Sequence, residues 1–174
     1  MELMSELRLI QEWYRYNSFV RKKYLWLIFS DKVPPKERYK SRGGSYPSIV
    51  DIFVHVLDAY RWWFLFVYED RMKDWRRLRE VKKYTREEVT KEERRIDSYV
   101  MDFVNSLQPG DLRRRMKDQR RGRTLELRQM LLHMVEEELQ HRGEMNALLW
   151  QMDVDPPIVS FHDYLRKRKL PLHQ

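Results

Sequence analysis

Four long stretches of this chain repeat apolar residues every three or four positions, and this spacing limits the fold more than any other feature of the sequence. Repeats of this kind place the apolar side chains on one face of an α-helix. The first stretch, at about residues 2–29, has its repeating positions at Leu9, Trp13, Tyr16, Phe19, Val20, Tyr24, Leu27 and Ile28. The spacing predicts an amphipathic helix, which the prolines and glycines of residues 31–47 end.

The three other stretches follow residues that favour the start of a helix. Ser48 is the expected N-cap of a helix over about residues 49–68, which is apolar almost all round. Thr85, with a glutamate three residues later, has the spacing of a capping box before a third helix, which ends at the sequence QPGD. Thr124 is expected to cap a fourth helix over about residues 125–152.

The segments between and after these helices favour one architecture. Residues 71–84 are expected to be a fraying helix end and a loop, and residues 113–127 could form a brief extended hairpin. A short helix near residues 161–167 is expected to pack across the other helices. Because strand alternation is weak, the sequence predicts an all-α fold, a four-helix bundle with a short C-terminal helix, in one domain over residues 1–174.

The composition excludes several kinds of site. The chain has no cysteine, so it cannot form disulfides, thiolate metal ligands or a cysteine nucleophile, and any thiol chemistry needs a thiol from outside. The first residues lack the apolar run of a signal peptide. The longest aromatic run, RWWFLFVY, is far shorter than the ~20 apolar residues that cross a bilayer. We therefore expect a cytoplasmic protein with no membrane contact.

The fourth predicted helix carries two ionisable residues on an otherwise apolar face. At about 100° per residue, one arc collects Met130, Met134, Glu137, His141, Met145, Leu148 and Met152. A buried carboxylate is costly without a partner, which can be a cation, a hydrogen-bond network or a metal. A metal would satisfy Glu137 and His141 together, whereas an arginine of another helix could pair with Glu137 alone.

The second predicted helix offers a third ligand. His55 is the ionisable residue near the centre of its inner arc, and the small Ala59 one turn later leaves space beside the imidazole. Metal sites in bundle cores typically combine a ligand on one helix with a pair one turn apart on another. Two imidazoles and one carboxylate could hold Zn²⁺, Fe²⁺ or Ni²⁺ and leave positions open for water or substrate.

Polar neighbours of these residues admit more than one interpretation. His133, one turn before Glu137, could be a fourth ligand or a general base, but a polar residue flanking the site is the preferred interpretation. Asp58 could orient an imidazole, although an exposed helix residue is the simpler interpretation. Solvation or salt bridges, rather than metal binding, are expected for Glu136, Glu138 and Glu144.

Both predicted ligand helices lie in longer segments with a common resemblance. The segments are PSIVDIFVHVLDAYRWWF, GRTLELRQMLLHMVEEELQHRGEMNALLWQM and the following DVDPP. Together they resemble the DinB/YfiT-like family of metal-binding four-helix bundles. In that family a histidine of the second helix joins two residues spaced by four near the HRG of a later helix to bind a divalent metal. Those positions fall on His55, Glu137 and His141. A histidine is more usual where Glu137 stands, and the carboxylate favours Fe²⁺, Mn²⁺ or Zn²⁺.

The resemblance also implies a class of function. Some members are thiol-dependent transferases, so it implies a divalent-metal-dependent S-transferase or hydrolase that acts on a small electrophilic substrate, with a low-molecular-weight thiol as a further cofactor. Members often form homodimers, which makes a second copy an expected partner. A non-catalytic bundle that a metal holds together is one alternative.

A basic segment motivates the other alternative, a nucleic-acid-binding protein. Residues 113–123, RRRMKDQRRGR, contain seven basic residues among eleven, in a chain whose formal net charge is +8. Such a cluster could bind phosphates in a salt-dependent manner. No recognised nucleic-acid-binding motif surrounds the cluster, so nucleic acid is the least expected partner.

Overall fold

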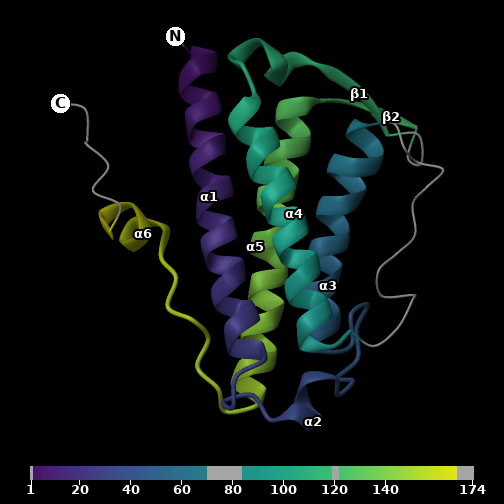
Figure 1. Cartoon of the computed structure of the whole chain (residues 1–174), viewed down its shortest axis with the longest axis vertical. Coiled ribbons are helices and arrows are strands. Elements are labelled where there is room, and N and C mark those ends of the chain that lie inside the picture. Colours follow the sequence, from purple (N-terminus) through teal and green to yellow (C-terminus); the bar gives the residue numbers. More distant parts are fainter. Residues whose placement is uncertain (1, 70–83, 119–121, 168–174) are drawn as a thin grey trace.

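Four long helices pack side by side in the computed structural model, which describes residues 2–69, 84–118 and 122–167 (Figure 1). They are α1 (Glu2–Ile28), α3 (Ile49–Tyr60), α4 (Arg86–Ser106) and α5 (Leu127–Gln151). A π-helical segment, η1 (Arg61–Tyr68), continues α3. The prediction of an all-α helical bundle is confirmed. Residues 70–83, most of the predicted fraying end and loop, lie outside the described residues.

The helices run in two parallel pairs. In Figure 1, α1 and α5 descend while α3 and α4 ascend, and each helix packs against neighbours from both pairs. The contact between α3 and α5 is therefore antiparallel. Because of this direction, residues early in α3 lie beside residues late in α5.

Side-chain caps define where two of these helices begin. Ser48 Oγ accepts a hydrogen bond from the backbone N–H of Asp51, and the Asp51 carboxylate accepts one from the backbone of Ser48. Thr85 and Glu88 make the same reciprocal pair before α4. Both predicted caps are confirmed. Each box satisfies backbone donors that the first helical turn leaves without a partner.

The start of α5 differs from the prediction. The extended hairpin forms from β1 (Arg115–Asp118) and β2 (Arg123–Glu126), which pair antiparallel with Lys117 opposite Thr124. Thr124 is therefore part of a strand, and the prediction that it caps the helix is wrong. Glu126 is the N-cap instead, and its backbone N–H donates to the Gln129 side chain. Residues 119–121 of the basic cluster lie outside the described residues.

The core lies between the four long helices. The helix α1 presents a wide inner face in which Ile10, Tyr14 and Tyr24 are almost fully buried. Leu9, which the periodicity placed inside, is 56% exposed. The inner face also contains a buried arginine, Arg21. Phe19 is also exposed, at 37%, whereas the other predicted positions from Tyr16 to Ile28 are buried. The predicted inner face is therefore wrong only at Leu9 and Phe19.

Short elements lie at the ends of the bundle and along one side of it. A short helix, α2 (Pro35–Arg38), lies in the connection between α1 and α3, and the 3₁₀ helix η4 (Pro109–Arg113) precedes the hairpin. The last helix, α6 (Phe161–Lys167), packs on α1, where Phe161 stacks on Trp13 with ring centroids 4.3 Å apart. The predicted terminal helix is therefore confirmed.

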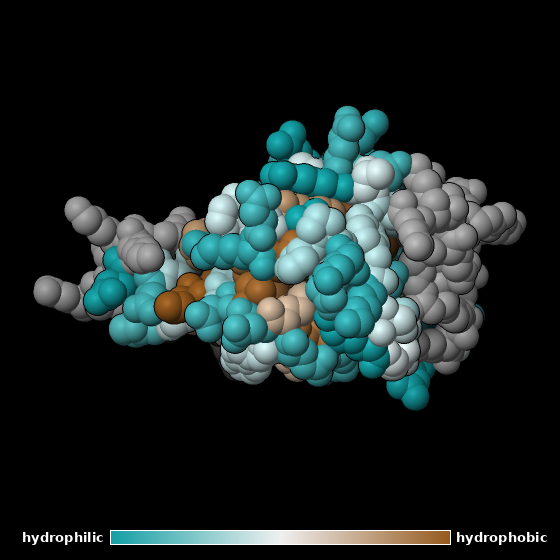
Figure 2. All heavy atoms as spheres, turned by 90° about the horizontal axis from the view of Figure 1, so that it is seen from below, coloured by the Kyte–Doolittle hydropathy of each residue, from teal (hydrophilic) through white to brown (hydrophobic). Residues whose placement is uncertain are grey.

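The end of the bundle where α1 and α5 finish is largely hydrophilic. Figure 2 views this end from below, and hydrophobic side chains show between hydrophilic ones near its centre. None of the described helices combines the length and the apolar character needed to cross a membrane.

Candidate metal centre

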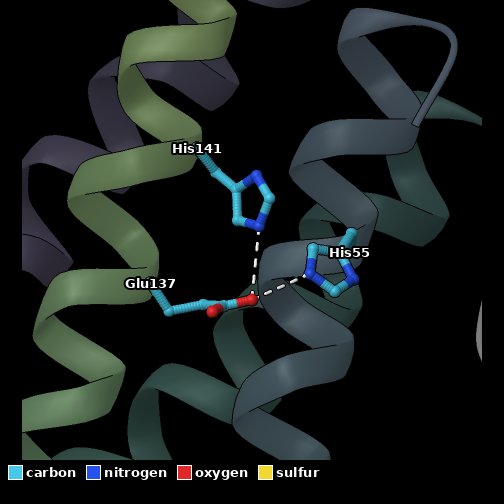
Figure 3. Close-up of side chains that lie close together, drawn as sticks. All are labelled: His55, Glu137 and His141. Carbon is cyan, nitrogen blue, oxygen red and sulfur yellow. Dashed lines mark hydrogen bonds and ion pairs between the residues drawn. The ribbon is translucent and has the colours of Figure 1, made fainter. Parts of the chain in front are cut away.

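The three predicted ligands come together between α3 and α5. Figure 3 shows His55 on α3 facing Glu137 and His141 on α5. The Nε2 atoms of His55 and His141 lie 3.0 Å and 3.2 Å from the same carboxylate oxygen, Glu137 Oε1. One donor atom of each residue lies within 4.8 Å of the other two. The group could therefore hold a metal ion.

Helix geometry accounts for this convergence. Glu137 and His141 are four residues apart, so they lie one turn apart on one face of α5. The antiparallel contact with α3 then brings His55, in the second turn of that helix, opposite this pair. The three side chains lie at the edge of the core. The side chains of His55 and Glu137 are each 20% exposed, and that of His141 is 5% exposed.

The charges of the group suit a cation. Hydrogen bonds from His141 and His55 hold the pKa of the Glu137 carboxyl well below its usual range, although burial acts in the opposite direction. The carboxylate is therefore ionised at neutral pH. Two imidazole nitrogens and one carboxylate oxygen form a donor set typical of Zn²⁺ or of iron in an open site. The residues present thus fit a divalent metal.

Glu144 is a direct neighbour of this group. Its Oε2 lies 2.8 Å from His141 Nδ1, on the other side of the ring from Glu137. Burial alone would lower the pKa of His141, but the hydrogen bonds to Glu137 and Glu144 outweigh it and raise the pKa. When Nδ1 donates to a carboxylate, the lone pair of Nε2 is free for a metal. The expectation that Glu144 is solvated or salt-bridged agrees with this contact and with its 43% exposed side chain, and the same contact orients the ring of His141.

Tyr46 covers the imidazoles from the loop before α3. Its ring stacks on His55, with ring centroids 3.8 Å apart and planes 18° apart, and meets His141 edge-on at 5.4 Å. In the same loop, just before Tyr46, Gly43 and Gly44 have φ values of 86° and 83°, a conformation that favours glycine. Sequence reasoning missed Tyr46 because a loop has no periodicity, although an aromatic residue between paired glycines and Pro47 was a signal.

His133 and Asp58 lie outside the group of three. His133 Nε2 is 3.9 Å from Glu137 Oε2, and its Nδ1 is 3.3 Å from Glu136. This position agrees with a polar residue that flanks the site. Asp58 is buried and forms a 3.0 Å ion pair with Arg61, so the expectation of an exposed residue is wrong.

An arginine from another helix does pair with a glutamate of α5, but that residue is Glu138 and not Glu137. Arg21 Nη1 donates to Glu138 Oε2 at 2.9 Å, and the hydroxyl of Tyr60 donates to the same oxygen at 2.6 Å. Glu138 is buried by these contacts. Within the part of the chain that the structure describes, the ion-pair neighbours of Glu137 are the imidazoles of His55, His133 and His141, and no arginine or lysine neutralises its carboxylate.

Comparison with known proteins assigns a family to this geometry. No curated protein matches the sequence significantly. The model of the DinB family, however, matches residues 4–170, a span that includes all four long helices nearly in full and the three converging side chains. This span is most of the chain, and the resemblance carried by the two ligand helices is confirmed. The chain belongs to the DinB family.

Proposed function

We propose that this protein is a divalent-metal-dependent enzyme that activates a thiol or a water molecule against a small electrophilic substrate. The observation that carries the proposal is the meeting of His55, Glu137 and His141 at one point between two helices. Membership of the DinB family supports it. Three protein ligands leave coordination positions open, which is typical of catalytic rather than structural sites.

Each residue of the site has a distinct task in this proposal. His55 and His141 bind through Nε2, and Glu137 contributes a negative charge that favours a divalent over a monovalent cation. Glu144 orients His141, and Tyr46 covers the ring of His55. A divalent metal held there would act as a Lewis acid and lower the pKa of a bound thiol or water. The lack of cysteine means that the thiol would be a small molecule.

Elemental analysis of the purified protein tests the metal site. We expect about one equivalent of Zn, Fe, Ni or Mn per chain, and a large loss of metal content in His55→Ala, Glu137→Ala and His141→Ala. Matched controls are Glu136→Ala, which removes a neighbouring exposed glutamate, and His162→Ala, which removes an 86% exposed histidine. Unchanged metal content in all three site variants would contradict the assignment.

A second measurement separates an enzyme from a bundle that the metal only stabilises. The purified protein, with and without a chelator, is assayed for loss of a small thiol in the presence of a panel of electrophiles such as epoxides and activated halides. The proposal expects thiol consumption that the chelator and Glu137→Ala both abolish. Lower thermal stability after chelation, with no turnover of any electrophile or ester, would favour the non-catalytic alternative.

A further inference from the structure

A cleft lies beside the three candidate ligands, and its lining has a distinctive charge. The cleft has a volume of about 370 Å³, within the range of ~300–1,000 Å³ of small-molecule sites. It lies between the loop before α3 and one face of α5. Its lining consists of Gly43, Gly44, Ser45, Tyr46, Ile52, Gln140, His141, Glu144, Ala147 and Leu148.

Two residues join the cleft to the metal centre. His141 and Tyr46 both line the cleft. His141 is one of the three candidate ligands, and Tyr46 stacks on another of them, His55. Ile52 lies one turn before His55 on α3, and Leu148 lies two turns after His141 on α5. A small molecule bound at the candidate ligands would therefore extend its far end into this cleft.

The ionisable residues of the described cleft lining contrast with the strongly basic composition of the chain. The chain contains 35 lysines and arginines, yet none is among the described residues that line the cleft. Arg42 precedes the loop, but its guanidinium pairs with Glu37. Glu144 is the carboxylate of the lining, and its side chain is 43% exposed. The side chains of Ile52, Ala147 and Leu148 add apolar surface to the wall of the cleft.

We propose that this cleft selects the part of the substrate that lies away from the metal centre, and that it accepts an ammonium or another N–H donor and disfavours a carboxylate or phosphate. This inference rests on the proposed function. An ammonium would be attracted to Glu144 and could donate to it and to Gln140. An anion would be repelled by Glu144 and would find no lysine or arginine in the described lining. The inferred class is an aminothiol or another small amine with a short apolar body.

Three thiols with the same two-carbon arm test the inference. They are cysteamine, 2-mercaptoethanol and 3-mercaptopropionate, whose far ends are positive, neutral and negative. Each is titrated into the Co²⁺-loaded protein at low salt, and the thiolate-to-cobalt absorption band gives a Kd. We expect cysteamine to bind tightest and 3-mercaptopropionate weakest, with about a tenfold difference for a partly exposed carboxylate. The difference should shrink at high salt.

The variant Glu144→Gln separates the effect of the cleft from the intrinsic acidity of each thiol. Glutamine keeps an oxygen that can accept from His141 Nδ1 but removes the negative charge. The ratio of the variant Kd to the wild-type Kd cancels the chemistry of the thiol itself. Because Glu144 also contacts His141, the ratio for the neutral 2-mercaptoethanol is the reference. We expect the ratio for cysteamine to be about three to ten times this reference and the ratio for 3-mercaptopropionate to lie below it. Glu136→Gln, which changes an exposed glutamate outside the cleft, is the matched control with ratios near one.

The outcomes distinguish this inference from the function on which it rests. If Glu144→Gln changes all three Kd values by the same factor, Glu144 does not select charge, and the cleft assignment is overturned while the metal site stands. If Co²⁺ does not bind to the wild-type protein, or binds equally to Glu137→Ala, the metal site is wrong and the cleft assignment falls with it. A charge-dependent pattern in the ratios supports both.

Discussion

Glu137 and Glu138 are neighbours on α5, yet they enter opposite electrostatic surroundings. Glu138 points into the core, where it pairs with Arg21 and accepts from Tyr60, and its side chain is 4% exposed. Glu137 points toward α3, where it meets two imidazoles, and its side chain is 20% exposed. One carboxylate therefore has a permanent cation from the chain, and the other has neighbours that can bind a cation with it.

Arg21 is the centre of a buried network of ion pairs. Arg21 also reaches Asp97 at 2.9 Å and Glu93 at 3.5 Å, and Lys22 pairs with Asp97. Burial alone would lower the pKa of Arg21, but Glu138 and its other neighbours raise it above its usual value. The guanidinium thus stays charged at any accessible pH. Glu138 is therefore part of the packed core, whereas Glu137 is available to bind a cation.

Removing the central arginine should have the largest effect on stability. Arg21→Met leaves three buried or half-buried carboxylates without their main cation, and we expect it to lower the free energy of unfolding by about 3–5 kcal/mol. Denaturant titration measures this. Arg15→Met, on the more exposed side of the same helix, should cost less than about 1 kcal/mol. Equal effects of the two substitutions would show that the Arg21 cluster has no special role.

Metal addition should separate the two glutamates directly. A divalent metal at about 100 times its Kd should raise the free energy of unfolding of the wild-type protein by about 2.7 kcal/mol. Glu137→Gln should lose most of this increment because it removes the charged ligand. Glu138→Gln should be less stable without metal but keep the increment. Denaturant titrations with and without metal measure both, and the reverse pattern would exchange the roles assigned to the two residues.

The hydrogen bond from Tyr60 to Glu138 should have a smaller, pH-dependent effect. Tyr60→Phe removes a buried hydrogen bond to a charged acceptor, and we expect a loss of about 1.5–2 kcal/mol at neutral pH. Burial, with a further contribution from Glu138, raises the pKa of Tyr60 well above its usual value. The folded state therefore favours the protonated phenol.

The sign of the pH dependence follows from this shift. The contribution of Tyr60 should be fully present below its unfolded pKa of about 10 and should be lost as the pH rises toward the folded value. Unfolding titrations between pH 8 and pH 11 should show a steeper loss of stability for the wild-type protein than for Tyr60→Phe. Parallel curves for the two proteins would contradict the assignment.

His133 marks the limit of the metal centre and should give the smallest effect. Its Nε2 is 3.9 Å from the Glu137 oxygen that faces away from the other two histidines. We expect His133→Ala to keep its metal content and to change the free energy of unfolding by about 0.5 kcal/mol or less, since its side chain is 34% exposed. Loss of metal in this variant would extend the ligand set to four residues.

Local patterns of the sequence were sufficient for much of the fold and for the three candidate ligands. The caps at Ser48 and Thr85 were predicted because a capping box involves residues three positions apart. Glu137 and His141 stood out because they interrupt an apolar face. The prediction that Thr124 caps the last long helix was wrong because its pairing with Lys117 in the hairpin depends on contacts between two strands and not on residues within one turn.

Local sequence patterns were enough to predict the four long helices and the ionisable side chains that share a face of one helix, because both depend on contacts within about one turn. The packing of the helices was needed to show that Arg21 meets Glu138 rather than Glu137, that Tyr46 covers His55, and that Glu144 lines a cleft beside His141. These depend on the rotation and direction of helices against one another. Packing of the whole core sets that rotation, so the sequence of one segment alone does not predict it.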